Sequence, residues 1–196
     1  FEVFNQDNSS IGLFYFDPYA REGKGGGAWM DAFVSQSFLL NEKPVVFNVL
    51  NIVKPTKGQA TLLSFDEATT LFHEFGHAAH GLFSQVKYPS LAGTSTARDF
   101  VEFPSQFNED WDIEPTVIAN YALNNKTGEA IPAALLERVL DSVKFGQGYD
   151  TVEYLAAALL DMEWHMIGAD ANISDVAGFE QQALQKHGLD YAPIPP

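Results

Sequence analysis

Residues 64–81 read SFDEATTLFHEFGHAAHG, and this stretch decides the fold of the chain around it. Ser64, with Glu67 three residues later, forms the pattern of a capping box, in which each side chain satisfies a free backbone N–H at the start of a helix. Apolar residues then recur with the helical period at Leu71, Phe72, Phe75, Ala78 and Ala79. The sequence therefore predicts a helix from residue 64 to about Gly81.

Two histidines and a glutamate in this helix form the pattern of a metal site. His73 and His77 lie four residues apart, so both side chains fall on one face and can direct a ring nitrogen at one cation. Catalytic zinc has three protein ligands and an open position for water. Glu74 lies about 100° around the helix from His73, where it can take a proton from that water and pass it to a leaving amine. We predict zinc held by both histidines, with Glu74 as general base.

A pair of solvated histidines is the alternative to a metal site, and the neighbouring residues argue against it. Phe72 and Phe75 flank the motif, while Gly76 and Ala78 are small, so the helix is expected to be buried on most sides. Burial of polar side chains without partners is costly. A metal ion would supply the partner that these histidines need.

The third ligand is left open by the spacing alone. His80 lies on the next turn of a straight helix, too far to share a tetrahedral ion with His73, so we expect it to pack or to support other groups. A carboxylate from another element is the better candidate. Asp99, Glu102 and Glu109 are all available, and the residues by themselves do not choose among them.

The chain divides into a strand-rich part and a helical part. Residues 1–63 are predicted to form strands and loops, with strands at 11–16 and 45–53, where β-branched and aromatic residues lie between turn residues. Residues 64–196 are predicted to be helical, and Pro104 is expected to start or kink one helix. The helices that follow the first are expected at 101–111, 115–123, 132–143, 151–167 and 174–187. We therefore expect an α+β fold, predominantly helical, with a small β-sheet at its N-terminal side.

Composition and charge exclude several function classes. Of 196 residues, 46% are hydrophobic and 19% charged, which is typical of a packed globular protein. The net charge is −15, and residues 99–196 carry 17 acids against 4 bases, so they would repel nucleic acids and anionic membranes. Cysteine is absent, which excludes disulfides, thiol catalysis and thiolate metal ligands. No apolar run approaches the ~20 residues that span a bilayer.

Several motifs together resemble one enzyme family. They are YFD at 15–17, AREGK at 20–24, GGAW at 26–29, HEFGH at 73–77, LAGT at 91–94, RDFVEFPSQ at 98–106, NEDW at 108–111, GQGY at 146–149, EYL at 153–155, LLD at 159–161 and WH at 164–165. Almost end to end, the chain resembles the thimet-oligopeptidase-type (M3) zinc metallopeptidases. Residues 98–100 and 102–104 are most similar to those of the bacterial peptidyl-dipeptidases.

This resemblance implies a zincin-like fold and a complete set of metal ligands. It implies that Glu102 is the third zinc ligand, on a helix that packs across the HEFGH helix. Asp99, Ser105, Gln106 and Glu109 then become candidates for orienting the ligands, and the sequence does not rank them. The implied activity is the zinc-dependent hydrolysis of short peptides, with release of C-terminal dipeptides.

The resemblance also sets expectations for the extent of the protein. Family members are much longer, so we expect 1–196 to be a single partial domain, the catalytic core, with the N- and C-terminal parts of the full enzyme absent. The residues that stabilise the oxyanion are expected outside this chain. The alternatives are an oligoendopeptidase of the same family, a zinc-binding fragment inactive in isolation, and a structural domain with an empty site. The lack of cysteine fits both cytoplasm and periplasm, and we place the cytoplasm first.

Overall fold

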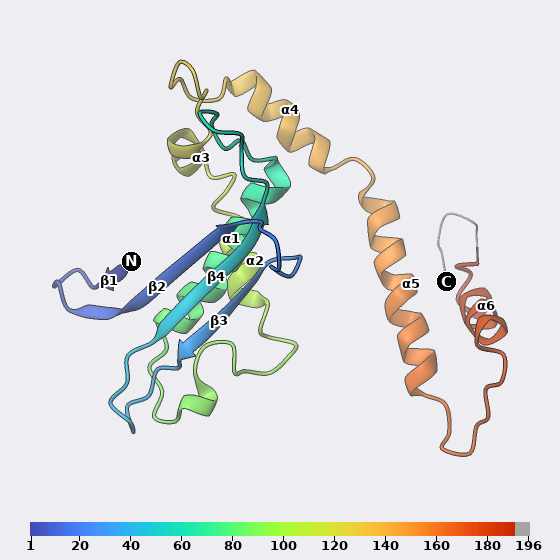
Figure 1. Cartoon of the computed structure of the whole chain (residues 1–196). Coiled ribbons are helices and arrows are strands. Elements are labelled where there is room, and N and C mark those ends of the chain that lie inside the picture. Colours follow the sequence, from blue (N-terminus) through green and yellow to red (C-terminus); the bar gives the residue numbers. More distant parts are fainter. Residues whose placement is uncertain (191–196) are drawn as a thin grey trace. The chain divides into compact units, whose positions relative to one another are not determined.

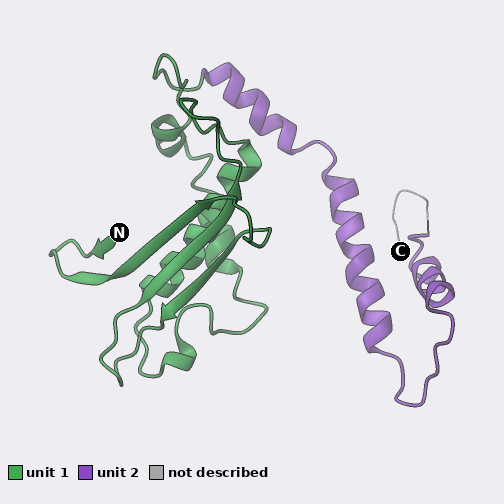
Figure 2. Ribbon diagram, in the orientation of Figure 1, with its two compact units in different colours: residues 1–131 green, residues 132–196 purple. Residues whose placement is uncertain are grey.

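A computed structural model of the chain describes residues 1–190. The chain forms two compact units, Phe1–Ile131 and the residues from Pro132 onward, shown in green and purple in Figure 2. All of the motif residues at 73–77 and 98–111 lie in the first unit. The single partial domain expected over 1–196 stays a prediction, and each unit is described by itself.

The first unit contains a four-stranded sheet. Its strands are β1 (Glu2–Phe4), β2 (Ser10–Tyr19), β3 (Trp29–Val34) and β4 (Val45–Ile52), in the order β1-β2-β4-β3. β2 and β4 are parallel, and the other two pairings are antiparallel. β3 therefore lies at one edge of the sheet.

The strands expected at 11–16 and 45–53 are confirmed as β2 and β4, while β1 and β3 had not been assigned. In β3, alternate residues Met30, Ala32 and Val34 are half-buried, and those between them are exposed. All but one residue of β3 are apolar, so the usual polar-apolar alternation of a half-buried strand is missing from its sequence. The strand forms because β4 supplies an antiparallel partner, from Trp29 opposite Val49 onward.

Helix α1 (Phe65–Leu82) covers one face of the sheet (Figure 1). The capping box is present: Glu67 N donates to Ser64 Oγ, and Ser64 N donates to the Glu67 carboxylate. The sheet-facing side of the helix is held by a core of Val46, Ala78 and Leu82, each at most 3% exposed. The predicted helix and its start are thus confirmed.

Helix α2 (Phe103–Glu109) packs against α1. It begins just before Pro104, the first of the two arrangements that the sequence allowed for this proline. Gly76 of α1 lies at the crossing: a Cβ on residue 76 would come within 2.7 Å of Ser105 Cα and 2.8 Å of Pro104 O. Only a residue without a side chain lets the two helices approach this closely.

The first unit also contains the short η1 (Pro89–Leu91) and α3 (Pro115–Tyr121). The second unit consists of α4 (Ala133–Val143), α5 (Gln147–His165) and α6 (Val176–Lys186).

In the second unit, α5 and α6 pack together through Ala156 and Leu184, which are both nearly fully buried. The rings of Trp164 and Phe179 also meet, with their centroids 4.2 Å apart.

The α+β expectation is confirmed, with about 40% of the residues in helices. Within residues 1–190, no helix has both the length and the apolar character needed to cross a membrane.

We predict that Gly76→Ala lowers the free energy of unfolding by about 1–2 kcal/mol, because overpacking at the helix crossing outweighs the better helix propensity of alanine. Urea unfolding followed by circular dichroism measures this. Gly148→Ala is the control, since a Cβ on residue 148 of α5 has no neighbour within 4 Å, and it should cause no loss. Equal stabilities of the two variants would contradict the close crossing.

Candidate active site

Three side chains from two elements meet beside α1. Glu102, which directly precedes α2, places its Oε2 3.2 Å from His73 Nε2 and 3.1 Å from His77 Nε2. One ligand atom from each residue lies within 4.8 Å of the other two. Within residues 1–190, these three residues are the one set of His, Asp or Glu side chains that is close enough together to hold a metal ion.

The spacing of these three atoms suits a small divalent ion. In a tetrahedral zinc site with bonds of about 2.0–2.1 Å, the ligand atoms lie roughly 3.3 Å apart, close to the 3.2 and 3.1 Å between Glu102 Oε2 and the two histidine nitrogens. Two imidazoles and one carboxylate are also a ligand set of catalytic zinc sites. The side chains therefore fit the metal that the HEFGH motif predicts, and their role as ligands stays a prediction.

Glu109 of α2 lies on the far side of the His73 ring. Its Oε1 is 2.6 Å from His73 Nδ1, so the ring can donate to the carboxylate while Nε2 faces the candidate metal position. This arrangement fixes both the tautomer and the orientation of a ligating histidine. Among the four residues that the sequence could not rank, Glu109 is thus in direct contact with a candidate ligand.

The Ser105 side chain also contacts a candidate ligand, whereas the side chains of Asp99 and Gln106 make no hydrogen bond to any of the three. Ser105 Oγ lies 2.9 Å from Glu102 Oε2. Asp99 and Gln106 are exposed, and no hydrogen bond joins either side chain to the three candidate ligands in the part of the chain that the structure describes.

His80 does not join the candidate metal site. Its ring lies 6.4 Å, centroid to centroid, from the ring of Phe100, and it lines an apolar groove with Phe103 and Phe107. Its Nδ1 is buried without a hydrogen-bond partner in the described residues. This placement agrees with the expectation that it packs outside the metal site.

Glu74 is buried at the base of the site. Only 5% of the residue is exposed, and its Oε2 has no hydrogen-bond partner among the described residues. Burial raises the pKa of the Glu74 carboxyl, although the charge of His73 opposes the shift. A carboxylate destabilised in this way gains more from accepting a proton than a solvated one does. The position therefore suits a proton acceptor.

The charge states of the candidate ligands also suit metal binding. Burial lowers the pKa of His77, which favours the neutral imidazole with a free lone pair. For Glu102, partial burial raises the pKa, but the hydrogen bond from Ser105 and the charges of His77 and His73 outweigh it and leave the pKa lowered. Both groups therefore favour the deprotonated forms that bind metals.

The candidate ligands and Glu74 open into a cleft of about 350 Å³. Trp29 and Met30 of the edge strand β3 also line this cleft. These two lining residues were not predicted, because the sequence of β3 lacks the alternating pattern of a strand. The remaining lining residues are Ala28, Thr94 and Val101.

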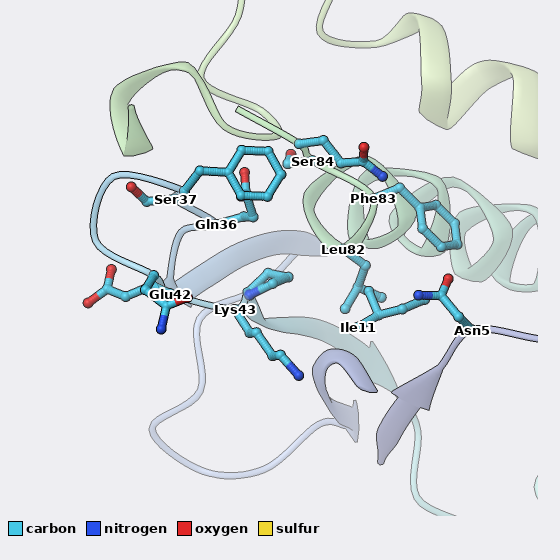
Figure 3. A pocket seen from close by; sticks show the side chains of 13 residues that line it. Asn5, Ile11, Gln36, Ser37, Glu42, Lys43, Leu82, Phe83 and Ser84 are labelled. Atoms are coloured by element: carbon cyan, nitrogen blue, oxygen red, sulfur yellow. The ribbon is translucent and has the colours of Figure 1, made fainter. Parts of the chain in front are cut away.

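A second hollow, of about 530 Å³, lies at the C-terminal end of α1, where Figure 3 shows Ile11 and Leu82 among its lining side chains. Its buried polar groups bind the surrounding backbone: Gln36 Oε1 accepts from Val86 N, and Ser37 Oγ donates to Lys87 O. None of residues 73–77 lines it. The candidate active site is therefore the cleft beside β3.

The sequence of residues 1–190 matches the model of Peptidase family M3. The chain belongs to this family. Family M3 consists of metallopeptidases, which agrees with a site built from histidines and carboxylates. The resemblance found in the sequence motifs is thus confirmed.

Two M3 relatives align with the whole chain. Over 195 residues, the chain is 51% identical to the dipeptidyl carboxypeptidase of Salmonella typhimurium and 47% identical to that of Escherichia coli. It is 37% identical over 169 residues, or 84% of the chain, to oligopeptidase A of Escherichia coli. The chain spans 29% of the length of the two dipeptidyl carboxypeptidases and 25% of oligopeptidase A.

We predict that Glu109→Ala weakens zinc binding by about 10–100-fold, because the His73 ring loses the carboxylate that orients it. Competition with a chelator measures the affinity. Glu137→Ala, which changes an exposed glutamate on α4, should leave the affinity unchanged. The same affinity in both variants would show that Glu109 does not orient His73.

Proposed function

We propose that the chain supplies the metal ligands and the general base of a zinc peptidase that cleaves short peptides and releases C-terminal dipeptides. One observation carries the proposal. His73, His77 and Glu102 converge on one position beside the buried Glu74, and all four open into the same cleft.

The chemistry requires a nucleophile, a polarised carbonyl and a proton carrier. Zinc, when bound by His73, His77 and Glu102, would lower the pKa of water to about 7 and polarise the scissile carbonyl. Glu74 takes the proton that the attacking water loses and delivers it to the nitrogen of the departing amine. The burial of Glu74 supports this role, because a desolvated carboxylate is a stronger proton acceptor than an exposed one.

The edge strand β3, which contributes Trp29 and Met30 to the cleft, suits an extended peptide. β3 pairs with β4 along one side, and its other side is the edge of the sheet in the described residues. An edge strand offers backbone N–H and C=O groups to a peptide that lies alongside it. We propose that β3 holds the substrate backbone while Glu74 faces the scissile bond.

Sequence identity to the relatives favours the release of dipeptides over internal cleavage. The two dipeptidyl carboxypeptidases share 51% and 47% of residues with the whole chain, against 37% over a shorter span for oligopeptidase A. Internal cleavage by an oligoendopeptidase of the same family is the alternative. The activity rests on the whole protein, because the chain spans 29% of the length of its dipeptidyl carboxypeptidase relatives.

A second candidate function is zinc binding without turnover. The cleft contains candidate ligands and a general base, but the described residues place no arginine or lysine in it. Loss of one oxyanion donor typically costs about 10²–10³ in rate. A chain of 196 residues that binds zinc without cleaving peptides would agree with this second candidate.

We predict that Glu74→Gln keeps stoichiometric zinc but lowers kcat by at least about 10²-fold, because the amide cannot accept the proton. The variant is made in a polypeptide that contains this chain and has the full length of its M3 relatives. Zinc content by atomic emission and kcat with a short peptide are measured together. Glu137→Gln is the matched control. Retained turnover in Glu74→Gln would remove Glu74 from the mechanism.

We predict that the same full-length enzyme releases dipeptides from a peptide with a free C-terminus and leaves its C-terminally amidated form uncut. The reason is that a peptidyl-dipeptidase must bind the terminal carboxylate of the substrate to place the scissile bond two residues from the end. Mass spectrometry of the products distinguishes the two activities. Internal cleavage of the amidated peptide would favour the oligoendopeptidase.

A further inference from the structure

Ser105 is fully buried, yet its hydroxyl contacts the most exposed of the three candidate ligands. Ser105 is 0% exposed, and its Oγ lies 2.9 Å from Glu102 Oε2. This Oε2 is the same oxygen that approaches His73 Nε2 and His77 Nε2. The Glu102 side chain is 51% exposed, so little packing restrains it. A hydrogen bond from a buried donor can therefore decide where Oε2 lies.

The Ser105 hydroxyl has two acceptors within reach and one hydrogen to donate. The first is Glu102 Oε2, and the second is the backbone oxygen of Glu102, also at 2.9 Å. Gln106 N already donates to this backbone oxygen. The carboxylate oxygen carries charge, and hydrogen bonds to charged acceptors are about twice as strong as neutral ones. The hydrogen is therefore directed at Oε2.

Ser105 itself is held in place by the helix that carries the histidines. Its Cα lies at the α1–α2 crossing, where a Cβ on Gly76 would come within 2.7 Å. Gly76 lies between His73 and His77 in the sequence. Ser105 thus connects the element that carries the two histidines with the carboxylate that comes from outside it.

We propose that Ser105 is a positioning residue, whose hydroxyl holds Glu102 Oε2 at the distance at which it completes the metal site with His73 and His77. The inference rests on the proposed function, because it takes these three side chains as the ligands. It goes further by assigning the placement of the third ligand to one buried hydroxyl. Without the hydroxyl, only the contacts with the two histidines would hold the half-exposed carboxylate over the site.

The test compares two serines that make the same local hydrogen bond. Ser142 Oγ of α4 donates to Val139 O, three residues earlier, as Ser105 can to Glu102 O. Ser142 has no metal ligand as a neighbour in this contact. Ser105→Ala should weaken zinc binding by the full chain about 10–100-fold in chelator competition. Ser142→Ala should leave it unchanged.

A purely structural role is separated by two further measurements. The circular dichroism spectrum and unfolding midpoint of the metal-free chain should be close to those of the parent chain in both serine variants. The visible spectrum of bound Co²⁺ should change in Ser105→Ala only. If the affinity loss were matched by a loss of metal-free stability and the Co²⁺ spectrum were unchanged, the positioning role would be wrong.

A double variant distinguishes failure of this inference from failure of the ligand assignment. Glu102→Ala should lose most zinc affinity, and adding Ser105→Ala to it should have no further effect, because the hydroxyl acts only through that carboxylate. If Glu102→Ala binds zinc normally, both the ligand assignment and the role of Ser105 are overturned. If Glu102→Ala loses zinc but Ser105→Ala does not, only the role of Ser105 is overturned.

Discussion

The candidate site depends on the close crossing of α1 and α2 at Gly76. A single helix can direct two ligands at one ion, and the third has to come from another element. Gly76 allows α2 to approach until Ser105 Cα occupies the space of a missing side chain. Hydrogen bonds then join α1 to α2, where Asn108 Nδ2 donates to Phe72 O and the His73 ring meets Glu109. Thr69 Oγ1 of α1 also donates to Asp112, which follows α2 in the chain. The crossing thereby sets the position of Glu102.

The burial of the candidate site leaves polar atoms that a metal ion or a reacting group could satisfy. Glu74 and His77 are both largely buried, and Glu74 Oε2 and His77 Nδ1 have no hydrogen-bond partner in the described part of the chain. Buried polar atoms without partners destabilise a fold by about 1–3 kcal/mol each. Such a cost is tolerated at sites where the groups meet a ligand or a reacting atom. The same burial that weakens the fold raises the pKa of Glu74 and makes it a better proton acceptor.

Local sequence signals predicted the parts of the structure that depend on neighbours in the chain. Ser64 and Glu67 gave the start of α1, and the spacing of His73 and His77 gave their shared face, because capping and helical periodicity act over a few residues. The position of Glu102 depends instead on how α1 and α2 cross. The spacing of residues left Asp99, Glu102 and Glu109 as equal candidates for the third ligand, and only the resemblance to a family implied Glu102. Ser105 and Glu109 stayed unranked for the same reason. β3 was missed because its pairing with β4, rather than an alternating pattern, makes it a strand.

The three candidate ligands are restrained to different degrees, and this difference has a consequence for the site. His73 and His77 belong to a capped helix that packs on a sheet, so their backbone positions are fixed before any ion binds. Glu102 directly precedes α2 and its side chain is half exposed, so as a ligand it would be the least restrained of the three. A ligand that is free to rotate must lose that freedom on binding, which weakens the complex. The affinity of the site is then set less by the histidines than by whatever restrains Glu102. Besides the two histidines, the group that contacts this carboxylate is the buried hydroxyl of Ser105, which the helix crossing at Gly76 holds in place.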